Sequence, residues 1–231
     1  MELIASPRID FLRGLTSEIT HNYGRGRVIV AVDGVDGSGT AEFADGLAAT
    51  LREAGYDTFR ASIEDFHAPR RRDGNAGETG AEPPRETPAE FYEESYDYRT
   101  FRRVLIDPFR MGGSTGFQTS GFDRQREAPS QARWLTAGRD AMLVVDGVFL
   151  GRDELKGIWN YSIYLEVPWP VAFARLSEQA GTDPDPAAPS NQLRLQGQEL
   201  YLADAFPRGR ANAIVDNTDA DRPTREFADS C

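Results

Sequence analysis

Apolar runs and amphipathic stretches alternate along the chain, and this alternation predicts strands separated by helices. Runs such as VIVAVDG (28–34) and AMLVVDGVFL (141–150) are uninterrupted, which is typical of strands buried on both faces of a parallel sheet. Apolar residues recur at helical spacing between such runs. We expect strands over 28–34, 56–63, 141–150, 161–168 and 211–219, and helices over 6–22, 41–55, 169–181 and 192–206. The pattern predicts an α/β fold: a doubly wound, mainly parallel sheet with helices on both faces.

The remaining segments are less regular. Residues 90–109 are aromatic-rich and predict a helix over their second half, and 116–123 predict a strand or hairpin edge. Residues 68–90 are rich in Pro, Gly, Arg and Glu, so we expect a mobile loop there. We also expect a flexible C-terminal tail around 220–231. The length of 231 residues fits one domain, 1–231.

Composition excludes several classes of protein. The net charge of −11 argues against a nucleic-acid or anionic-membrane binder, which would carry a basic face. No apolar stretch approaches the ~18 residues of a membrane span, and the N-terminus does not resemble a secretory signal. The one cysteine, Cys231, allows no intrachain disulfide. We therefore expect a soluble cytoplasmic protein with no membrane or nucleic-acid partner; a homo-oligomer stays open.

A glycine loop joins the first predicted strand to the helix that follows. Glycine lets backbone amides turn inward without a Cβ clash, and such amides at a helix N-terminus bind phosphate. The phosphate-loop pattern is G-x-x-x-x-G-K-[ST], where Lys reaches the terminal phosphates and Ser/Thr coordinates Mg²⁺. The spacing fits, and the candidate phosphate-binding residues are Gly34, Asp36, Gly37, Ser38, Gly39, Thr40 and Ala41.

The last two positions depart from that pattern. Thr40 stands where the lysine is expected, and Ala41 offers no hydroxyl for Mg²⁺. The missing charge-assisted contact is worth roughly 1.5–3 kcal/mol, or about tenfold to a hundredfold in affinity. Lys156 is the only lysine among 26 basic residues, so arginines and backbone amides must hold any phosphate. Arg70, Arg71 or Arg72 of the expected loop could replace the lysine.

Two carboxylates follow predicted strands. Asp65 comes after the second strand and could accept a proton from a substrate hydroxyl, although it could equally cap a helix. Asp146 ends the AMLVVDG strand, beside the glycine loop, where a carboxylate can organise Mg²⁺ or its water. His67 is the only histidine nearby. Aromatic and acidic residues further on could hold a base or sugar, or belong to the core: Tyr92, Tyr96, Asp97, Tyr98, Phe122 and Asp123.

These segments together resemble the uridine kinase and phosphoribulokinase family of P-loop kinases, in particular its actinobacterial uridine kinase-like members, with a degenerate Walker A motif. The resemblance runs from Val28 to Thr218, through VIVAVDGVDGSG, SIEDFHAPR, FYEESYDYRTF, GFQTSGFD, VVDGVFL and GQELYLADAFPRGRANAIVDNTD.

The resemblance implies a role for each matching residue. Asp65 would be the general base on a nucleoside 5′-hydroxyl, with Arg175 also in the catalytic group and Asp146 acting indirectly on Mg²⁺ bound with ATP. Arg175 and Arg194 would belong to a lid around 175–198 that closes over the phosphates. His67, Tyr98, Phe122 and Asp123 would bind the nucleoside. The lid is acidic here, with Glu178, Asp183 and Asp185 where the family has arginines.

Three functions follow from these observations. The first is a kinase that moves the terminal phosphate of ATP to a nucleoside 5′-hydroxyl or a related small alcohol. The second is a catalytically impaired relative that binds a nucleoside or nucleotide without turnover, as Thr40, Ala41 and the acidic lid suggest. The third is a kinase of the same fold with a different acceptor.

Overall fold

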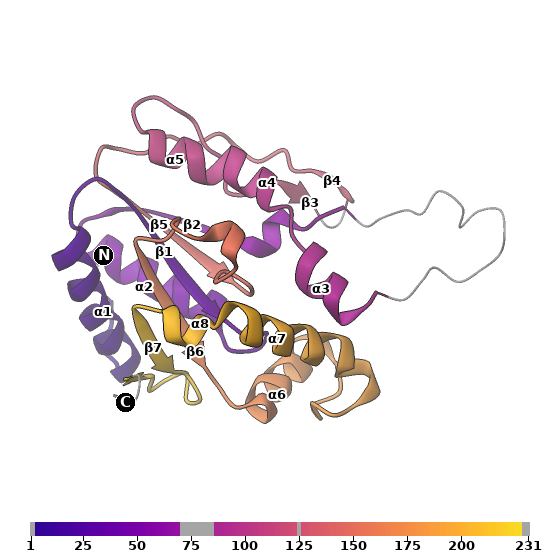
Figure 1. Ribbon diagram of the computed structural model, residues 1–231. Helices are drawn as coiled ribbons and strands as arrows, with labels where there is room; N and C mark the ends of the chain where they lie inside the picture. Colours follow the sequence, from indigo (N-terminus) through magenta and orange to yellow (C-terminus); the bar gives the residue numbers. More distant parts are fainter. Residues whose placement is uncertain (1–2, 70–85, 124–125, 228–231) are drawn as a thin grey trace, which may run out of the picture.

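The computed structural model describes residues 3–69, 86–123 and 126–227, and its centre is a six-stranded sheet (Figure 1). The strand order is β2-β5-β1-β6-β7-β8, and every neighbouring pair is parallel except β7 with β8. The strands are β1 (Arg27–Gly34), β2 (Asp57–Ser62), β5 (Ala141–Gly147), β6 (Tyr161–Glu166), β7 (Ala213–Asp216) and β8 (Thr224–Glu226). The prediction of a mainly parallel, doubly wound sheet is confirmed.

Helices cover both faces of the sheet. On one face, α1 (Pro7–Tyr23) and α2 (Thr40–Glu53) bury an apolar cluster that includes Leu12, Phe43 and Leu47. The other face carries a more aromatic cluster with Phe101, Phe109 and other rings. The elements that pack there or beside it are α3 (Pro88–Glu94), α4 (Tyr98–Phe101), α5 (Asp107–Met111), α7 (Gln192–Ala205) and α8 (Pro207–Arg210). Another long helix, α6 (Trp169–Ala180), follows β6.

Helical structure begins earlier in the aromatic segment than the sequence predicted. Thr87 caps α3 by accepting a hydrogen bond from the amide of Glu90, whose carboxylate accepts one from the Thr87 amide in return. This capping box, with proline as the first helical residue, is a start signal that the prediction overlooked. A π-helical turn, Arg102–Ile106, then joins α4 to α5.

Two other expectations differ in detail. Only the end of the segment 116–123 forms a strand: β3 (Phe122–Asp123) pairs antiparallel with β4 (Ala128–Pro129). The expected flexible tail includes β8, because Arg225 bonds the carbonyl of Asn212 (3.0 Å) and the Glu18 carboxylate (3.2 Å). Most of the expected 68–90 loop lies outside the described residues, as do Arg70, Arg71, Arg72 and Cys231. Within the described ranges, no helix has the length and apolar character needed to span a membrane.

Candidate functional site

The glycine loop leaves the carboxyl end of β1 and enters α2 at the centre of the sheet. Gly37 and Gly39 have φ angles of 79° and 86°, the left-handed region that side chains disfavour. A Cβ on Gly37 would lie 2.2 Å from the carbonyl oxygen of Ala172 in α6, and one on Gly39 would lie 2.9 Å from Asn217 Nδ2. The loop therefore needs glycine both for its turn and for its close approach to α6 and to the end of β7.

Ser38 lies at the bottom of this loop. Its backbone oxygen accepts a hydrogen bond from Asn217 Nδ2 (2.7 Å), and its backbone amide donates to Val35 (2.9 Å). Its hydroxyl is fully buried and has no hydrogen-bond partner among the described residues. A buried hydroxyl is normally paired, so this orphaned atom is consistent with a loop that is completed by a ligand.

Two arginines of the expected lid reach the glycine loop. Arg175 of α6 donates to the carbonyls of Gly37 and Ser38 (both 3.4 Å) and, at the end of β7, to those of Asn217 (2.9 Å) and Thr218 (3.0 Å). Arg194 of α7 forms an ion pair with Asp36 (3.1 Å). Both cations thus lie beside the loop whose position 40 carries no charge.

Gln198 of α7 makes a second contact with the loop. Its Oε1 accepts a hydrogen bond from the backbone amide of Asp36 (2.6 Å). That amide is one of the groups expected to face phosphate, and in this structure it is bonded to the Gln198 side chain of α7 instead. The sequence prediction did not include Gln198, because a glutamine in the middle of a helix carries no signal of such a contact.

The two predicted carboxylates lie at the same edge of the sheet as the loop. Asp65 lies in a 3₁₀ turn (Ile63–Phe66) directly after β2, and Asp146 lies in β5, paired in register with Ser62. Burial raises the pKa of Asp65 above its usual value, the charges of Asp146 and Glu64 raise it further, and Arg60 opposes the shift. The pKa of Asp146 is also raised by burial, against the influence of Arg60. A carboxyl with a raised pKa is suited to accept a proton near neutral pH.

The expected substrate residues partly gather around Asp65. The Asp65 carbonyl accepts a hydrogen bond from the Gly121 amide (2.9 Å), and this contact places the Phe122–Asp123 strand beside Asp65. Asp123 itself lies 3.6 Å from Arg126 in an ion pair. Next to Asp65, the His67 ring bonds Glu64 (3.0 Å).

Tyr98 lies deeper than a ligand contact would require. It begins α4, its hydroxyl is buried with no partner among the described residues, and burial raises its pKa. The guanidinium of Arg152 lies 5.2 Å from the ring centroid. Tyr98 is thus a partly buried residue whose hydroxyl is enclosed by the protein.

No family model and no curated protein matches this sequence, but solved structures do. A protein from Bacillus stearothermophilus described as a possible uridine kinase has a TM-score of 0.64 at 22% identity, over 90% of this chain and 96% of that one. A protein from Silicibacter sp. TM1040 described as a fructose transport system kinase has a TM-score of 0.60 at 25% identity, over 87% and 94%. A D-glycerate 3-kinase from Cryptococcus neoformans var. grubii has a TM-score of 0.50 at 9% identity, over 84% and 87%.

The chain has the P-loop kinase fold. The similarity to these structures extends over most of this chain and most of each neighbour. Low identity in two of the three means that the likeness concerns the fold, whereas the chemistry must be argued from the residues of this chain.

A magnesium ion, which the P-loop kinase fold implies, does not fit the residues present. Ala41 has no hydroxyl, and both carboxylate oxygens of Asp146 are bonded: Oδ1 to Arg60 Nη2 (2.7 Å) and Oδ2 to Ser62 Oγ (3.2 Å). Among the described residues, no group of three His, Cys, Asp or Glu side chains could hold a metal ion. The role expected for Asp146 at a magnesium ion therefore lacks the hydroxyl at position 41 and the further oxygen ligands that such a site needs.

One buried carboxyl beside the P-loop was not among the predicted site residues. Asp33 of β1 is 5% exposed and accepts hydrogen bonds from the amides of Gly34 (2.9 Å) and Leu150 (3.4 Å) and from the Tyr201 hydroxyl. Tyr201 belongs to α7, the helix that carries Gln198 and Arg194. Asp33 thus connects the start of the P-loop to α7. The sequence gives no sign of this, because its partners are far away along the chain.

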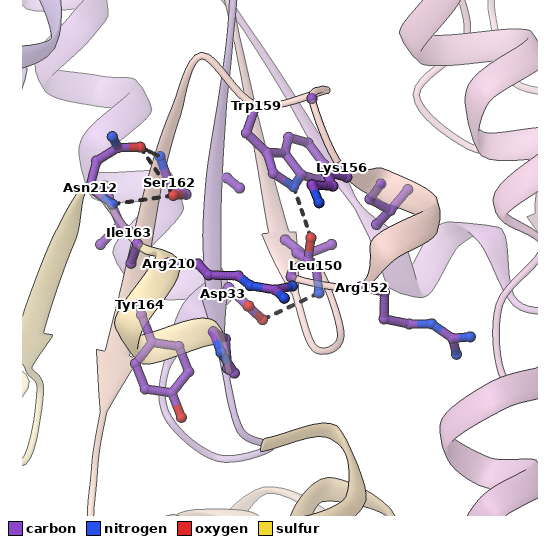
Figure 2. A pocket seen from close by; sticks show the side chains of 16 residues that line it. Asp33, Leu150, Arg152, Lys156, Trp159, Ser162, Ile163, Tyr164, Arg210 and Asn212 are labelled. Carbon is purple, nitrogen blue, oxygen red and sulfur yellow. Dashed lines mark hydrogen bonds between the residues drawn. The ribbon is translucent and has the colours of Figure 1, made fainter. Parts of the chain in front are cut away.

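A cavity of about 220 Å³ is lined by Asp33 and by residues of α8 (Figure 2). Trp159, Tyr164 and Arg210 line it, among others, but none of residues 34–41 does. Some polar groups in its wall are paired within the protein; for example, the Trp159 indole donates to the carbonyl of Leu150 (2.8 Å). The P-loop edge carries the unpaired Ser38 hydroxyl and the two carboxyls Asp65 and Asp146, so it is the candidate site for phosphate chemistry.

Asp33 makes the stability of the protein depend on pH. Burial raises its pKa from 3.8 to about 7, so between those values the folded protein retains a proton that the unfolded chain has released. Stability should then fall as the pH rises through this window, by at most about 1.4 kcal/mol per pH unit. Asp33→Asn imitates the protonated form and should flatten this slope. Urea denaturation of both proteins between pH 4.5 and 7.5 measures it, and parallel slopes would contradict the assignment.

Proposed function

We propose that this chain is a kinase that transfers the terminal phosphate of ATP to a hydroxyl group of a nucleoside or a related small alcohol. The observation that carries the proposal is Asp65: a carboxyl with a raised pKa at the sheet edge where the P-loop begins α2. Two of the solved structures with a similar fold are described as kinases, one of them as a possible uridine kinase.

The chemistry requires few groups from the protein. Asp65 accepts the proton of the acceptor hydroxyl, whose oxygen forms a bond to the terminal phosphorus while the bond to the bridging oxygen breaks, and ADP leaves with that electron pair. The backbone amides of the P-loop hold the phosphates at the N-terminus of α2. Arg175 and Arg194 supply the positive charge that a lysine at position 40 would provide. Because Arg194 pairs with Asp36, it must exchange this partner for phosphate when the lid closes.

A second function, nucleotide binding without turnover, is favoured by one specific observation. Thr40 and Ala41 begin α2 with no charge and no metal-binding hydroxyl. The described cations close to the loop, Arg60, Arg175 and Arg194, are already engaged with protein groups. Phosphoryl transfer depends on positioning and charge neutralisation. A loop with fewer phosphate contacts should therefore lower the rate of turnover more than the affinity for the nucleotide.

Restoring the P-loop pattern separates the two functions. Thr40→Lys/Ala41→Thr should bind Mg·ATP about tenfold to a hundredfold more tightly than the wild type, because the lysine adds a charge-assisted contact. Isothermal titration with Mg·ATP and with uridine, combined with detection of phosphorylated product, measures binding and turnover. Ala41→Thr alone is the control that separates the hydroxyl from the charge. Micromolar binding by the wild type with no gain in the double variant would show that the loop is not impaired.

A further inference from the structure

Arg60 is a basic residue at the site that was not among the predicted site residues. It lies in β2 with a side chain that is 19% exposed, and it extends along the sheet toward the N-terminus of α2. Its Nε donates to Asp45 of α2 (2.8 Å), and its Nη1 donates to the carbonyls of Ala61 and Val144 (both 3.0 Å). The guanidinium is therefore fixed by protein groups on several sides.

The remaining nitrogen of Arg60 lies between the two positions that matter for a metal ion. Nη2 donates to Asp146 Oδ1 (2.7 Å) and approaches the backbone oxygen of Ala41 (3.5 Å). In the P-loop pattern, the residue at position 41 provides the hydroxyl for Mg²⁺, and carboxylate oxygens are the ligands that this ion prefers. Here both positions converge on a guanidinium instead.

Replacing Arg60 by a metal ion would be costly. Mg²⁺ requires near-octahedral oxygen ligands, and Ala41 contributes no side-chain oxygen. Asp146 is only 4% exposed in its side chain, so its carboxylate needs a permanent positive partner once it is ionised. Arg60 already supplies this partner through the fold itself, and Ser62 holds the other carboxylate oxygen.

We infer that the Arg60 guanidinium takes the place of the divalent cation at the P-loop, so that this site binds a nucleoside triphosphate without Mg²⁺. The inference rests on the proposed function, which supplies the nucleotide. Arg60 neutralises Asp146 and keeps its charge away from the phosphates, while Arg175, Arg194 and the loop amides contact the phosphates themselves. The ligand class is a nucleoside di- or triphosphate in its metal-free form.

The test is a titration of the full-length wild type with ATP, once with excess Mg²⁺ and once with EDTA. We expect dissociation constants within about twofold of each other, since no group at the site gains from the metal. ATP binding that weakens tenfold or more in EDTA would overturn the inference while leaving the proposed function intact. Absence of ATP binding under both conditions would overturn the proposed function and the inference together.

Variants of Arg60 test whether this residue is the cause of the Mg²⁺-independent ATP binding. Arg60→Gln/Ala41→Ser frees Asp146 and restores a hydroxyl, so its ATP affinity should become Mg²⁺-dependent by tenfold or more. Arg52→Gln is the matched control, because Arg52 also connects α2 to β2, through the carbonyl of Thr58 (2.8 Å), but has no carboxylate partner in the described structure. Arg60→Lys keeps the charge and should stay independent of Mg²⁺, which covers the case in which the double variant folds poorly. Equal Mg²⁺ dependence in the wild type, the double variant and the lysine variant would overturn the role of Arg60.

Discussion

Asp65→Asn is expected to lower kcat by about 10²–10⁴-fold, the range in which a positioned general base contributes. Asparagine has nearly the same shape but cannot accept the proton of the acceptor hydroxyl. ATP and nucleoside should still bind, because the P-loop and the lid arginines are unchanged. Steady-state kinetics with the acceptor that shows turnover, together with calorimetry for both ligands, separates the loss of kcat from any change in binding.

The raised pKa of Asp65 adds a second readout of the same role. The acidic limb of the kcat profile should lie above the ordinary range for aspartate, because burial and the nearby charges of Asp146 and Glu64 favour the protonated form. Asp107→Asn is the matched control: Asp107 is exposed on α5, near the opposite end of the sheet, where Arg27 bonds the carbonyl of Phe109 (2.8 Å). An Asp65→Asn enzyme with wild-type kcat would remove Asp65 from the reaction.

Much of the fold could be predicted from the sequence, because the central strands are uninterrupted apolar runs. β1 and β5 lie side by side in the sheet, as the placement of Asp146 beside the glycine loop required. The elements that the prediction missed have weak local signals: β8 is a three-residue edge strand that depends on Arg225 reaching Glu18 and Asn212. Such contacts between distant segments leave no periodic pattern in the chain.

At the candidate site, too, some residues could be predicted from the sequence and others could not. The glycine spacing, Asp65 and Asp146 follow strand ends, and strand ends of a parallel sheet meet at one edge, so their proximity could be inferred from the sequence. Arg60, Asp33 and Gln198 could not be found in this way. Arg60 lies inside a strand whose neighbours determine where its guanidinium goes. The pKa of Asp33 is raised by burial, against the hydrogen bonds from Tyr201 and from the segment after β5, and these groups are distant along the chain.

The tight contact between the P-loop and α6 leads to the second large effect. Gly37→Ala should lower the free energy of unfolding by about 3 kcal/mol or more, because two costs add. A side chain with φ of 79° costs about 1–2 kcal/mol, and the added Cβ would overlap the backbone of Ala172, at 2.2 Å from its oxygen and 2.8 Å from its carbonyl carbon. Urea denaturation of both proteins measures the difference.

Gly157→Ala isolates the first of these costs. Gly157 has a similar φ of 75°, but a Cβ placed there meets no atom within 4 Å, so its substitution should cost only about 1–2 kcal/mol. Equal losses in the two variants would mean that α6 yields freely and that the loop is not held against it. A larger loss at Gly37 would show that α6, which also carries Arg175, fixes the loop in place. In that case Gly37→Ala should lose ATP binding along with the contact between the loop and α6, whereas Gly157→Ala should keep it. The reason is that the loop amides can face phosphate only if the helix that packs against the loop keeps its position.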